Sequence, residues 1–443
     1  MRSKESGCEV VLPGRQRIYF HAMGRKWFLA GVALYVLVAA VLFPFVLHIP
    51  VDLTFGSDAV GYSRTAINLL KRGFLTLDGV HPFLDREPGQ SVFLALVYAL
   101  FGVENPVGLY LSQGLLLLAA AAVFCREIAP LTSRRASGIF FVLLLTSGSV
   151  LHAVFSAYRE SLALSLLLLF TTLFLSASRC PSWWKTAGMG VLLAGVILTY
   201  YSFVLFPLAL ILLALIERRP AQRGSPSRRP LKPVFATVLL CYALIAAWGL
   251  RNFSYDGRFR VIADRRTAVM WYVRGEQAEN IRGLEPLKCL WSEYISRNWT
   301  GRSPACSYNA LMHQRWPEGS ETQTDSGDVI RTGQAKIRSH FLSYLWFSVF
   351  EVLELHFPYV GGGWSTAFNV YAALTAFVLY AGFLLGLRRL LRRGTLLFLL
   401  LILYNTGVFV LTDATPRYLV PVLFCYALFA AIGYDAALSP RRP

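Results

Sequence analysis

The chain has 443 residues, of which 55% are hydrophobic and only 15% are charged, and its mean hydropathy is +0.50. Soluble globular domains are about a quarter charged, so this composition excludes an ordinary soluble protein and predicts a surface that mostly faces lipid. A net charge of +18 would indicate a nucleic-acid partner in a soluble protein. Here the positive residues lie in short stretches between apolar runs, where they set membrane topology, so we expect no nucleic-acid partner.

Residues 1–27 are rich in basic side chains and precede an apolar run at 28–47. A cleaved signal peptide has a shorter apolar core and a cleavage site of small residues. This run instead ends in Pro44, Phe45 and His48. We therefore expect a retained membrane anchor that follows a cytoplasmic N-terminus.

Apolar runs recur along the whole chain, and a helix needs roughly 20 apolar residues to cross about 30 Å of hydrocarbon. The candidate spans are 28–47, 107–124, 136–155, 161–178, 186–199, 201–216, 234–250, 366–387, 395–411 and 418–436. The sequence therefore predicts an all-α integral membrane protein with about ten transmembrane helices. The fifth and sixth candidates adjoin at Tyr200 and Tyr201 and form either a tight hairpin or one misdivided segment.

The short basic segments test this assignment, because positive residues stay on the cytoplasmic side of a membrane. With the N-terminus inside, the basic segments 126–135, 179–185, 217–233, 388–393 and 437–443 all fall on that side. The agreement requires that two shorter apolar segments, 91–102 and 341–357, do not cross. We expect both to lie at the membrane surface or to re-enter from the outside.

The expected domain organisation follows from this topology. The parts are a cytoplasmic N-terminus (1–27), a membrane module (28–250) with its first outer loop at 48–106, an outer loop with an interfacial helix (251–365), C-terminal transmembrane helices (366–436) and a cytoplasmic tail (437–443). The compact chain and the lack of a large outer domain favour a bacterial inner (plasma) membrane, with both termini in the cytoplasm.

The first outer loop contains a stretch that is predicted to form an amphipathic helix on the outer membrane surface. Asp58 and Tyr62 are four residues apart and share a helix face, next to an apolar flank that includes Ala66 and Leu70. Ser57 is a candidate N-cap. The alternative for Asp58 is a second cap or a solvated carboxylate.

Charged residues also flank the apolar segments that follow. Arg86 and Glu87 precede a Pro–Gly pair, where a charged pair at the hydrocarbon edge either grips an anionic headgroup or only marks the boundary. Glu160 lies after a very short outer turn, and a carboxylate there is costly unless it is paired or functional. Arg159 is its alternative, purely structural partner.

Two further polar pairs lie at the outer ends of spans. Arg251 and Asn252 end the seventh candidate span, and Arg417 and Tyr418 begin the tenth. Arginine side chains at one depth can hold a phosphate or diphosphate with paired hydrogen bonds. Arg86 and Arg159 lie at the same expected level, although arginine at a span end is also ordinary.

Metal and disulfide chemistry stay open. The outer histidines, His81, His152, His313, His340 and His356, show no dependable metal-ligand spacing, so no cofactor is certain and a divalent metal stays possible. Cys289 and Cys306 are the two cysteines expected on the outer side, where they form a disulfide or remain two thiols. No nucleotide-binding glycine signature is present.

The order of these motifs along the chain resembles a family. The matching residues are Asp58 and Tyr62; Arg86, Pro88, Gly89, Phe101 and Gly102; Glu160; Trp248, Arg251, Asn252 and Gly257; and Arg417, Tyr418 and Pro421. In this order the chain resembles GT-C-fold glycosyltransferases that use polyprenyl-phosphate sugars, the group of the protein O-mannosyltransferases and the lipid A aminoarabinose transferase. The resemblance covers residues 28–436, and each single motif is short and degenerate.

The resemblance implies an inverting sugar transfer from a polyprenyl-phosphate donor to a hydroxyl of a lipid, glycan or protein acceptor, at the outer face. It implies Asp58 as general base or acceptor-orienting carboxylate, and Glu160 as the second carboxylate. Substrate-binding residues are then Tyr62, Arg86, Arg159, Arg251, Asn252, Arg417 and Tyr418, with the arginines on the lipid phosphate. One departure is Ala59, because many relatives have a second acidic residue after the first, and this puts a metal-chelating acidic pair in doubt.

Two other classes of function compete with this one. A transporter or lipid flippase would also have many spans, but it usually has ionisable groups near the bilayer midplane and repeated halves. The predicted span centres are almost free of charge, and no internal repeat is visible. The other alternative is an assembly subunit whose site no longer functions.

Overall fold

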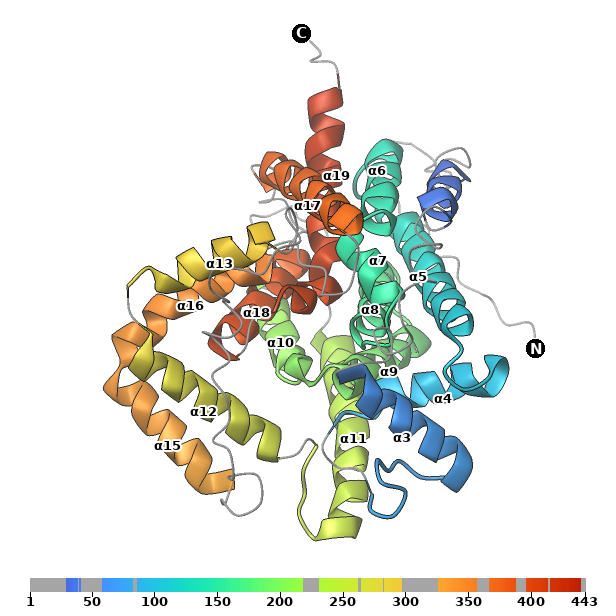
Figure 1. Cartoon of the computed structure of the whole chain (residues 1–443). Coiled ribbons are helices and arrows are strands. Elements are labelled where there is room, and N and C mark those ends of the chain that lie inside the picture. The colour runs from blue at the N-terminus through green and yellow to red at the C-terminus, as the bar shows by residue number, and fades with distance from the viewer. Residues whose placement is uncertain are drawn as a thin grey trace, which may run out of the picture.

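A computed structural model describes most of the chain. The described residues are 29–38, 40, 58–82, 86–217, 231–261, 264–281, 283–296, 326–356, 366–387, 396–412 and 415–439. Within these ranges the chain is helical, and the only strand-like pairing is an isolated bridge between Thr76 and Pro82 (Figure 1). The expected all-α fold is confirmed for this part of the chain.

The described helices succeed one another in this order along the chain. After a helix at Leu29–Val38 they are α3 (Asp58–Arg72), α4 (Gly89–Phe101), α5 (Pro106–Ile128), α6 (Arg134–Leu145), α7 (Gly148–Val154), α8 (Glu160–Arg179), α9 (Trp183–Thr199), η1 (Tyr201–Phe203), α10 (Phe206–Glu217), α11 (Leu231–Asp256), α12 (Asp264–Asn280), α13 (Glu285–Ile295), α15 (Ser326–Ser339), α16 (Phe341–His356), α17 (Thr366–Leu387), α18 (Leu396–Thr412), η3 (Pro416–Val422) and α19 (Leu423–Leu438).

Five helical segments are long and apolar enough to cross a membrane: α5, α8, α11, most of α17, and η3 joined to α19. The pair α6 and α7 makes a sixth if its 56° bend is one broken span. The chain is therefore a multi-pass membrane protein.

The expected count of about ten spans is not confirmed in the described part of the chain. The predicted spans 186–199 and 395–411 form α9 and α18, with 17 residues each. A helix of that length measures about 26 Å, less than the roughly 30 Å of hydrocarbon. The span predicted at 28–47 is described as a helix only at Leu29–Val38.

The two apolar segments that we expected not to cross are short helices. The first, predicted at 91–102, lies up to Phe101 in α4, which has 13 residues, and the described part of the second, predicted at 341–357, forms α16, which has 16. The amphipathic helix predicted at Asp58 is α3, which buries Ala59, Tyr62 and Ala66 against its neighbours. The predicted cap Ser57 lies outside the described residues. That these helices lie on a membrane surface stays a prediction.

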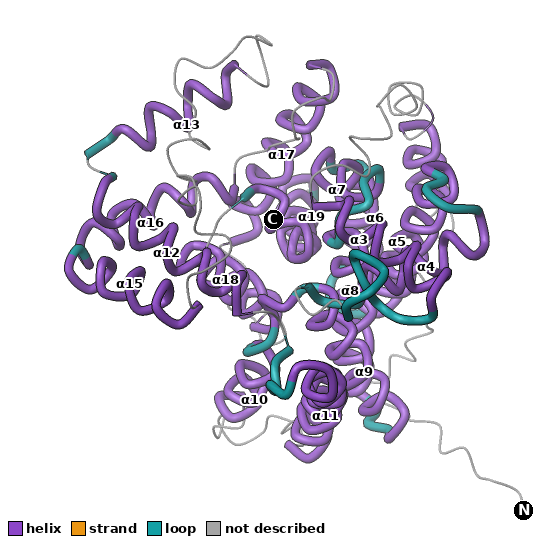
Figure 2. Tube along the Cα trace, turned by 60° about the horizontal axis from the view of Figure 1, so that its bottom comes forward, coloured by secondary structure: helices purple, strands orange, loops and turns teal. Residues whose placement is uncertain are grey.

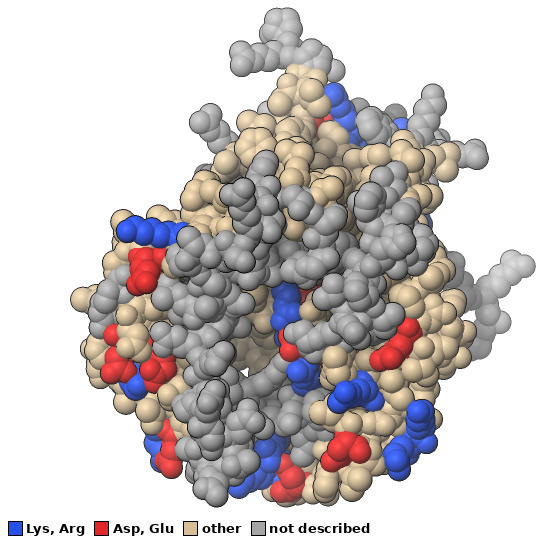
Figure 3. All heavy atoms as spheres, in the orientation of Figure 1, with Lys and Arg blue, Asp and Glu red and all other residues tan. Residues whose placement is uncertain are grey.

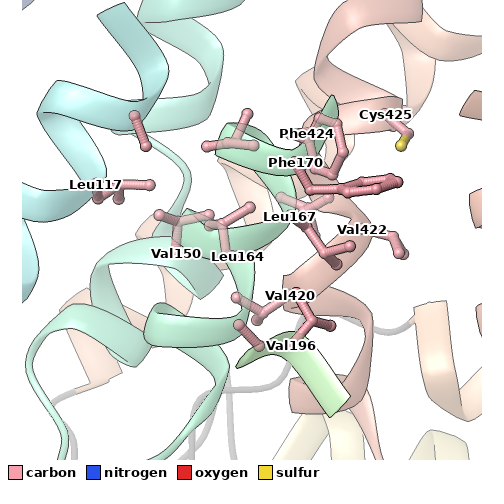
Figure 4. Close-up of a cluster of buried hydrophobic side chains, with 14 of the residues drawn as sticks. Leu117, Val150, Leu164, Leu167, Phe170, Val196, Val420, Val422, Phe424 and Cys425 are labelled. Atoms are coloured by element: carbon pink, nitrogen blue, oxygen red, sulfur yellow. The ribbon is translucent and has the colours of Figure 1, made fainter. Parts of the chain in front are cut away.

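The core of the bundle joins the N-terminal helices to the last ones. Its buried side chains come from α5, α7, α8, α9, η3 and α19, including Leu117, Val150, Leu164, Leu167, Phe170, Val196, Val420, Val422 and Phe424 (Figure 4). Through this packing η3 lies against α8, although the two segments are far apart in the sequence. The packing brings the start of η3 beside the start of α8, where Glu160 lies.

A second, smaller hydrophobic cluster lies to one side of the bundle (Figures 1 and 2). It is formed by α12, α13, α15 and α16, which we call the side unit, and its core is Ala278, Ile281, Cys289, Leu290, Ile337, Tyr344, Phe347 and Phe350. Cys289 is disulfide-bonded. The partner expected from the sequence, Cys306, lies outside the described residues.

Polar contacts at the opposite end of the bundle tie the helix ends together. Ser133, which caps α6, donates a hydrogen bond of 2.9 Å to Asp435 of α19. Arg179 at the end of α8 pairs with Glu127 near the end of α5. Since Glu160 begins α8 and Arg179 ends it, these contacts and the region around Glu160 lie at opposite ends of the same span.

Candidate functional site

Asp58 lies between two arginines. It is the first residue of α3, and its Oδ2 accepts a hydrogen bond of 2.6 Å from Nη2 of Arg417. Arg86, just before α4, donates through Nη1 to the main-chain oxygen of Asp58 at 2.7 Å, and its Nη2 lies 3.4 Å from Oδ1. Both carboxylate oxygens therefore face a guanidinium group.

Glu160 lies beside this group and is nearly enclosed. Its side chain is 3% exposed, and its Oε1 lies 3.8 Å from Nε of Arg417. Its Oε2 has no hydrogen-bond partner among the described residues. Glu160 is the first residue of α8, where the helix dipole favours a negative charge. Arg417 thus lies between the carboxylates of Asp58 and Glu160.

Arg159 pairs with Glu87 rather than with its neighbour Glu160. Its Nη1 donates to Oε2 of Glu87 at 2.7 Å, and both side chains are mostly buried. Glu87 also accepts a hydrogen bond from the main-chain N–H of Tyr201 at 3.2 Å. Burial alone would lower the pKa of Arg159, but the facing Glu87 and other nearby groups raise it well above its ordinary value, so Arg159 stays charged.

These contacts correct one sequence-based interpretation. Arg86 and Glu87 do not act as one charged pair, since Arg86 turns to Asp58 and Glu87 to Arg159. The ion pair of Arg159 is formed with Glu87, and its neighbour Glu160 adds a second favourable charge interaction. The physical reason is that α4 packs between α3 and α9, and adjacent side chains at its start point to different neighbours.

Tyrosine rings lie under all three of these arginines. The guanidinium carbon of Arg86 is 5.2 Å from the ring centre of Tyr62, and that of Arg159 is 4.3 Å from the ring of Tyr200. Arg417 lies between two rings, with Tyr158 at 4.8 Å and Tyr418 at 5.2 Å. These contacts are attractive and restrict the orientation of each guanidinium group.

Arg251 and Asn252 are not seen with these residues in the described contacts. The guanidinium of Arg251 lies over the rings of Trp248 and Tyr255, at 4.7 and 4.6 Å, all within α11. It also donates to Oδ1 of Asn252 at 2.9 Å. The described contacts join Arg86, Arg159 and Arg417, and a place for Arg251 in the same phosphate site stays a prediction.

The motif around Arg251 instead shapes the end of α11. Asn252 is fully buried and donates to the main-chain oxygen of Arg260 at 2.9 Å. Trp248 donates to the main-chain oxygen of Val261 at 3.1 Å. Gly257 follows the helix with a φ of +71°, a conformation that favours glycine. Together these contacts turn the chain back along α11.

Several residues of the site were not selected from the sequence. Glu87, Tyr158 and Tyr200 contact the arginines directly, and the ring of buried His152 lies 6.4 Å from that of Tyr158. The sequence could have indicated Glu87, because this residue adjoins Arg86 just before the start of a helix. For the two tyrosines the sequence offered only a position at the ends of spans, and this position is too common for tyrosine in membrane proteins to indicate a site.

We call Asp58, Glu87, Glu160, Arg86, Arg159 and Arg417 the charged cluster. It balances carboxylates against guanidinium groups. Figure 3 shows basic and acidic side chains meeting in a hollow near the middle of its face, between the sides formed by α12 and α3. Among the described residues no group of three His, Cys, Asp or Glu side chains is arranged to hold a metal ion. Arg86 and Arg417 present partly exposed guanidinium groups, which can bind an anion.

Comparison with solved structures gives distant likenesses. ArnT from Cupriavidus metallidurans, bound to undecaprenyl phosphate, matches over 94% of this chain and 78% of its own, with 14% identity and a TM-score of 0.42. The oligosaccharyltransferase AglB from Archaeoglobus fulgidus, in complex with an inhibitory peptide and a dolichol-phosphate, matches over 95% of this chain, with 13% identity and a TM-score of 0.42. This chain spans about half of the AglB chain, 53%. No protein-family model and no curated protein matches the sequence.

Proposed function

We propose that the protein is a membrane glycosyltransferase that moves a sugar from a polyprenyl-phosphate donor to a hydroxyl acceptor, with inversion, at the outer face of an inner membrane. The observation that carries the proposal is the carboxylate of Asp58, held by Arg86 and Arg417 beside the buried Glu160 at one end of a helical membrane bundle. A base and a phosphate site side by side are what this transfer needs.

Arg417 and Arg86 are the proposed ligands of the donor phosphate. Both side chains are partly exposed and both donate hydrogen bonds to Asp58. Arg159, in contrast, is enclosed by Glu87 and Tyr200. Two guanidinium groups can stabilise the charge that builds on the phosphate when the glycosyl bond breaks. Arg159 then holds Glu87 and the turn before α8 in place.

Asp58 is the proposed general base. In the observed arrangement its carboxylate is engaged by the arginines, so a bound phosphate that takes those hydrogen bonds leaves the carboxylate to the acceptor hydroxyl. The hydroxyl proton passes to Asp58 while the acceptor oxygen bonds to the anomeric carbon, and the electron pair of the breaking bond goes to the lipid phosphate. Direct displacement of this kind inverts the anomeric centre.

Glu160 is the proposed second carboxylate, which orients the sugar or the acceptor. Its unsatisfied Oε2 is a buried acceptor, and a buried polar atom is costly to leave unpaired. A sugar hydroxyl that donates to it would recover that cost.

A transfer assay with radiolabelled undecaprenyl-phosphate sugar tests this proposal. We expect transfer by the purified protein, and a loss of about 1,000-fold or more in Asp58→Asn, which keeps the shape but not the base. The matched control is Asp78→Asn, a carboxylate in the loop after α3 that hydrogen bonds to His81 rather than to the cluster. Near-normal transfer by Asp58→Asn would exclude Asp58 as the base.

The same protein in liposomes separates the competing classes of function. A transporter or flippase moves labelled lipid or solute across the bilayer without forming a glycosylated product. An assembly subunit does neither. Lipid movement without a product would therefore replace the proposed function by a flippase.

A further inference from the structure

The C-terminal end of α18 is capped by side chains from the side unit. The last four main-chain oxygens of a helix have no partner within the helix. In α18 these belong to Phe409, Val410, Leu411 and Thr412. Each of these four oxygens accepts a hydrogen bond from a side chain of the side unit.

Arg274 of α12 supplies most of that cap. It is 1% exposed, and it donates to the main-chain oxygens of Val410 at 3.0 Å, Phe409 at 3.4 Å, and Thr412. Tyr344 of α16 donates to the oxygen of Leu411 at 2.8 Å. The positive charge also complements the negative end of the helix dipole. Figure 2 shows α12, α16 and α18 next to one another, as their contacts require.

Other residues of the side unit hold the Arg274 side chain in this position. Arg274 forms an ion pair of 2.6 Å with Glu351 of α16, and both side chains are 2% exposed. It donates to Gln277 at 2.9 Å, and its guanidinium lies 5.3 Å from the ring centre of Phe347. A buried charge with this many partners has few other positions available.

The capped end of α18 is also what supports η3, which carries Arg417. The ring of Phe409 stacks on that of Tyr418 with centres 4.6 Å apart. Asn405 donates to the main-chain oxygen of Tyr418 at 3.1 Å. Arg417, next to Tyr418, then reaches Asp58 at 2.6 Å. A contact chain therefore runs from Arg274 through α18 to the proposed phosphate ligand.

We propose that Arg274 is a positioning residue: by capping α18 from the side unit it holds η3 so that Arg417 can bind the donor phosphate. The inference rests on the proposed function for its effect on the donor, but its effect on η3 does not. A displacement of about 1 Å at a binding group can cost roughly 100-fold in rate. The side unit thereby controls the site without contributing a group to it.

The test uses variants that remove the cap without leaving a lone buried charge. Arg274→Gln/Glu351→Gln removes both partners of the ion pair, and Tyr344→Phe removes only the hydrogen bond to Leu411. The matched control is Lys336→Met, which breaks a link within the side unit, between α15 and Glu276 and Glu279 of α12. All variants are made in the full chain.

The first measurement is amide hydrogen exchange of the detergent-solubilised protein. We expect faster exchange in η3 and the last turn of α18 for the double variant, and a smaller increase for Tyr344→Phe. Lys336→Met should raise exchange in α12 and α15 only. Unchanged exchange of η3 in the double variant would overturn the proposal, whatever the enzyme proves to do.

The second measurement is inhibition of transfer by undecaprenyl phosphate. We expect its inhibition constant and the KM for the donor to rise about tenfold in the double variant, with kcat changed less. Lys336→Met should leave the inhibition constant and the KM unchanged, even if its melting temperature is lower. Equal constants in the double variant and the control would mean that Arg274 serves stability alone. Absence of transfer by the unsubstituted protein would count against the proposed function and leave the exchange result to judge this inference.

Discussion

Asp58 and Arg417 are separated by 359 positions in the chain, and their ion pair of 2.6 Å joins the start of α3 to the last span. A carboxylate shared by two arginines is more strongly held than one in a single exposed pair, because each hydrogen bond to a charged group adds its own contribution. The same sharing means that any anion bound by the arginines competes with Asp58. Binding of an anion would therefore exchange the hydrogen bonds of the two arginines from Asp58 to the anion.

Substitution of Arg417 should separate charge from geometry. Arg417→Met removes a hydrogen bond worth roughly 1.5–3 kcal/mol, so we expect about a 10- to 100-fold loss in kcat/KM for the donor. Arg417→Lys keeps the charge but not the planar pair of donors, and we expect an intermediate loss. Arg135→Met, which disturbs an ion pair with Asp435 at the opposite end of the bundle, is the control. Equal activity in Arg417→Met and the control would remove Arg417 from the site.

Substitution of Glu87 tests how much the buried ion pair with Arg159 contributes to stability. In Glu87→Gln the buried Arg159 loses its charged partner, and breaking a buried pair costs roughly 3–5 kcal/mol. We expect a lower melting temperature in detergent, and a recovery in Glu87→Gln/Arg159→Gln, which removes both charges. The comparison is a double-mutant cycle followed by thermal unfolding. If the two single losses simply added in the double variant, the pair would have no energetic coupling.

At the scale of the elements, α16 is joined to α19 through His356, its last residue. The Nδ1 of His356 lies 2.7 Å from the main-chain oxygen of Val352, and its Nε2 lies 2.7 Å from the hydroxyl of Tyr426. A carbonyl oxygen only accepts, so Nδ1 donates to Val352; burial lowers the pKa of His356 and favours a neutral ring, whose Nε2 accepts from Tyr426. A neutral buried histidine makes this junction dependent on pH.

The sign of that dependence follows from the pKa. Burial lowers the pKa of His356, and the bond to Val352 only partly offsets this. The unfolded chain therefore binds a proton that the folded chain excludes, so stability is full above about pH 6.5 and falls as the pH falls below that value. We expect His356→Gln to weaken this fall in melting curves between pH 5 and pH 8. The same fall in His356→Gln as in the unsubstituted protein would exclude His356 as its source.

At the scale of the whole molecule, the charged groups sort to two ends of the bundle. Asp58, Glu160 and Arg417 gather at one end, and Ser133, Asp435, Arg179 and Glu127 at the other. The positive-inside rule predicts that the first end is outside. A side unit at the bundle's flank then adds the cap on α18 to this arrangement.

Chemical labelling can decide the orientation. Val80, in the loop after α3, and Trp183, at the start of α9, are 70% and 82% exposed. In intact cells we expect a membrane-impermeant maleimide to label Val80→Cys and to reach Trp183→Cys only after permeabilisation. The unsubstituted protein gives the background from its own cysteines. Labelling in the reverse order would place the proposed site on the cytoplasmic side.

The sequence alone determined the features that depend on neighbouring residues. Hydropathy over a window of about 20 residues is a local quantity, so the class of fold and the helix at 366–387 follow from it. Asp58 and Glu160 were also selected locally, as carboxylates at the starts of helices. The expected number of spans is not confirmed among the described residues, where α9 and α18 have 17 residues each.

Only the tertiary structure decided which charges meet. Arg86 and Glu87 are neighbours in the chain but pair with different partners, Asp58 and Arg159. The role of Arg274 had no signal at all in the sequence. The physical reason is that an ion pair depends on the distance between two side chains, and packing between distant helices sets that distance.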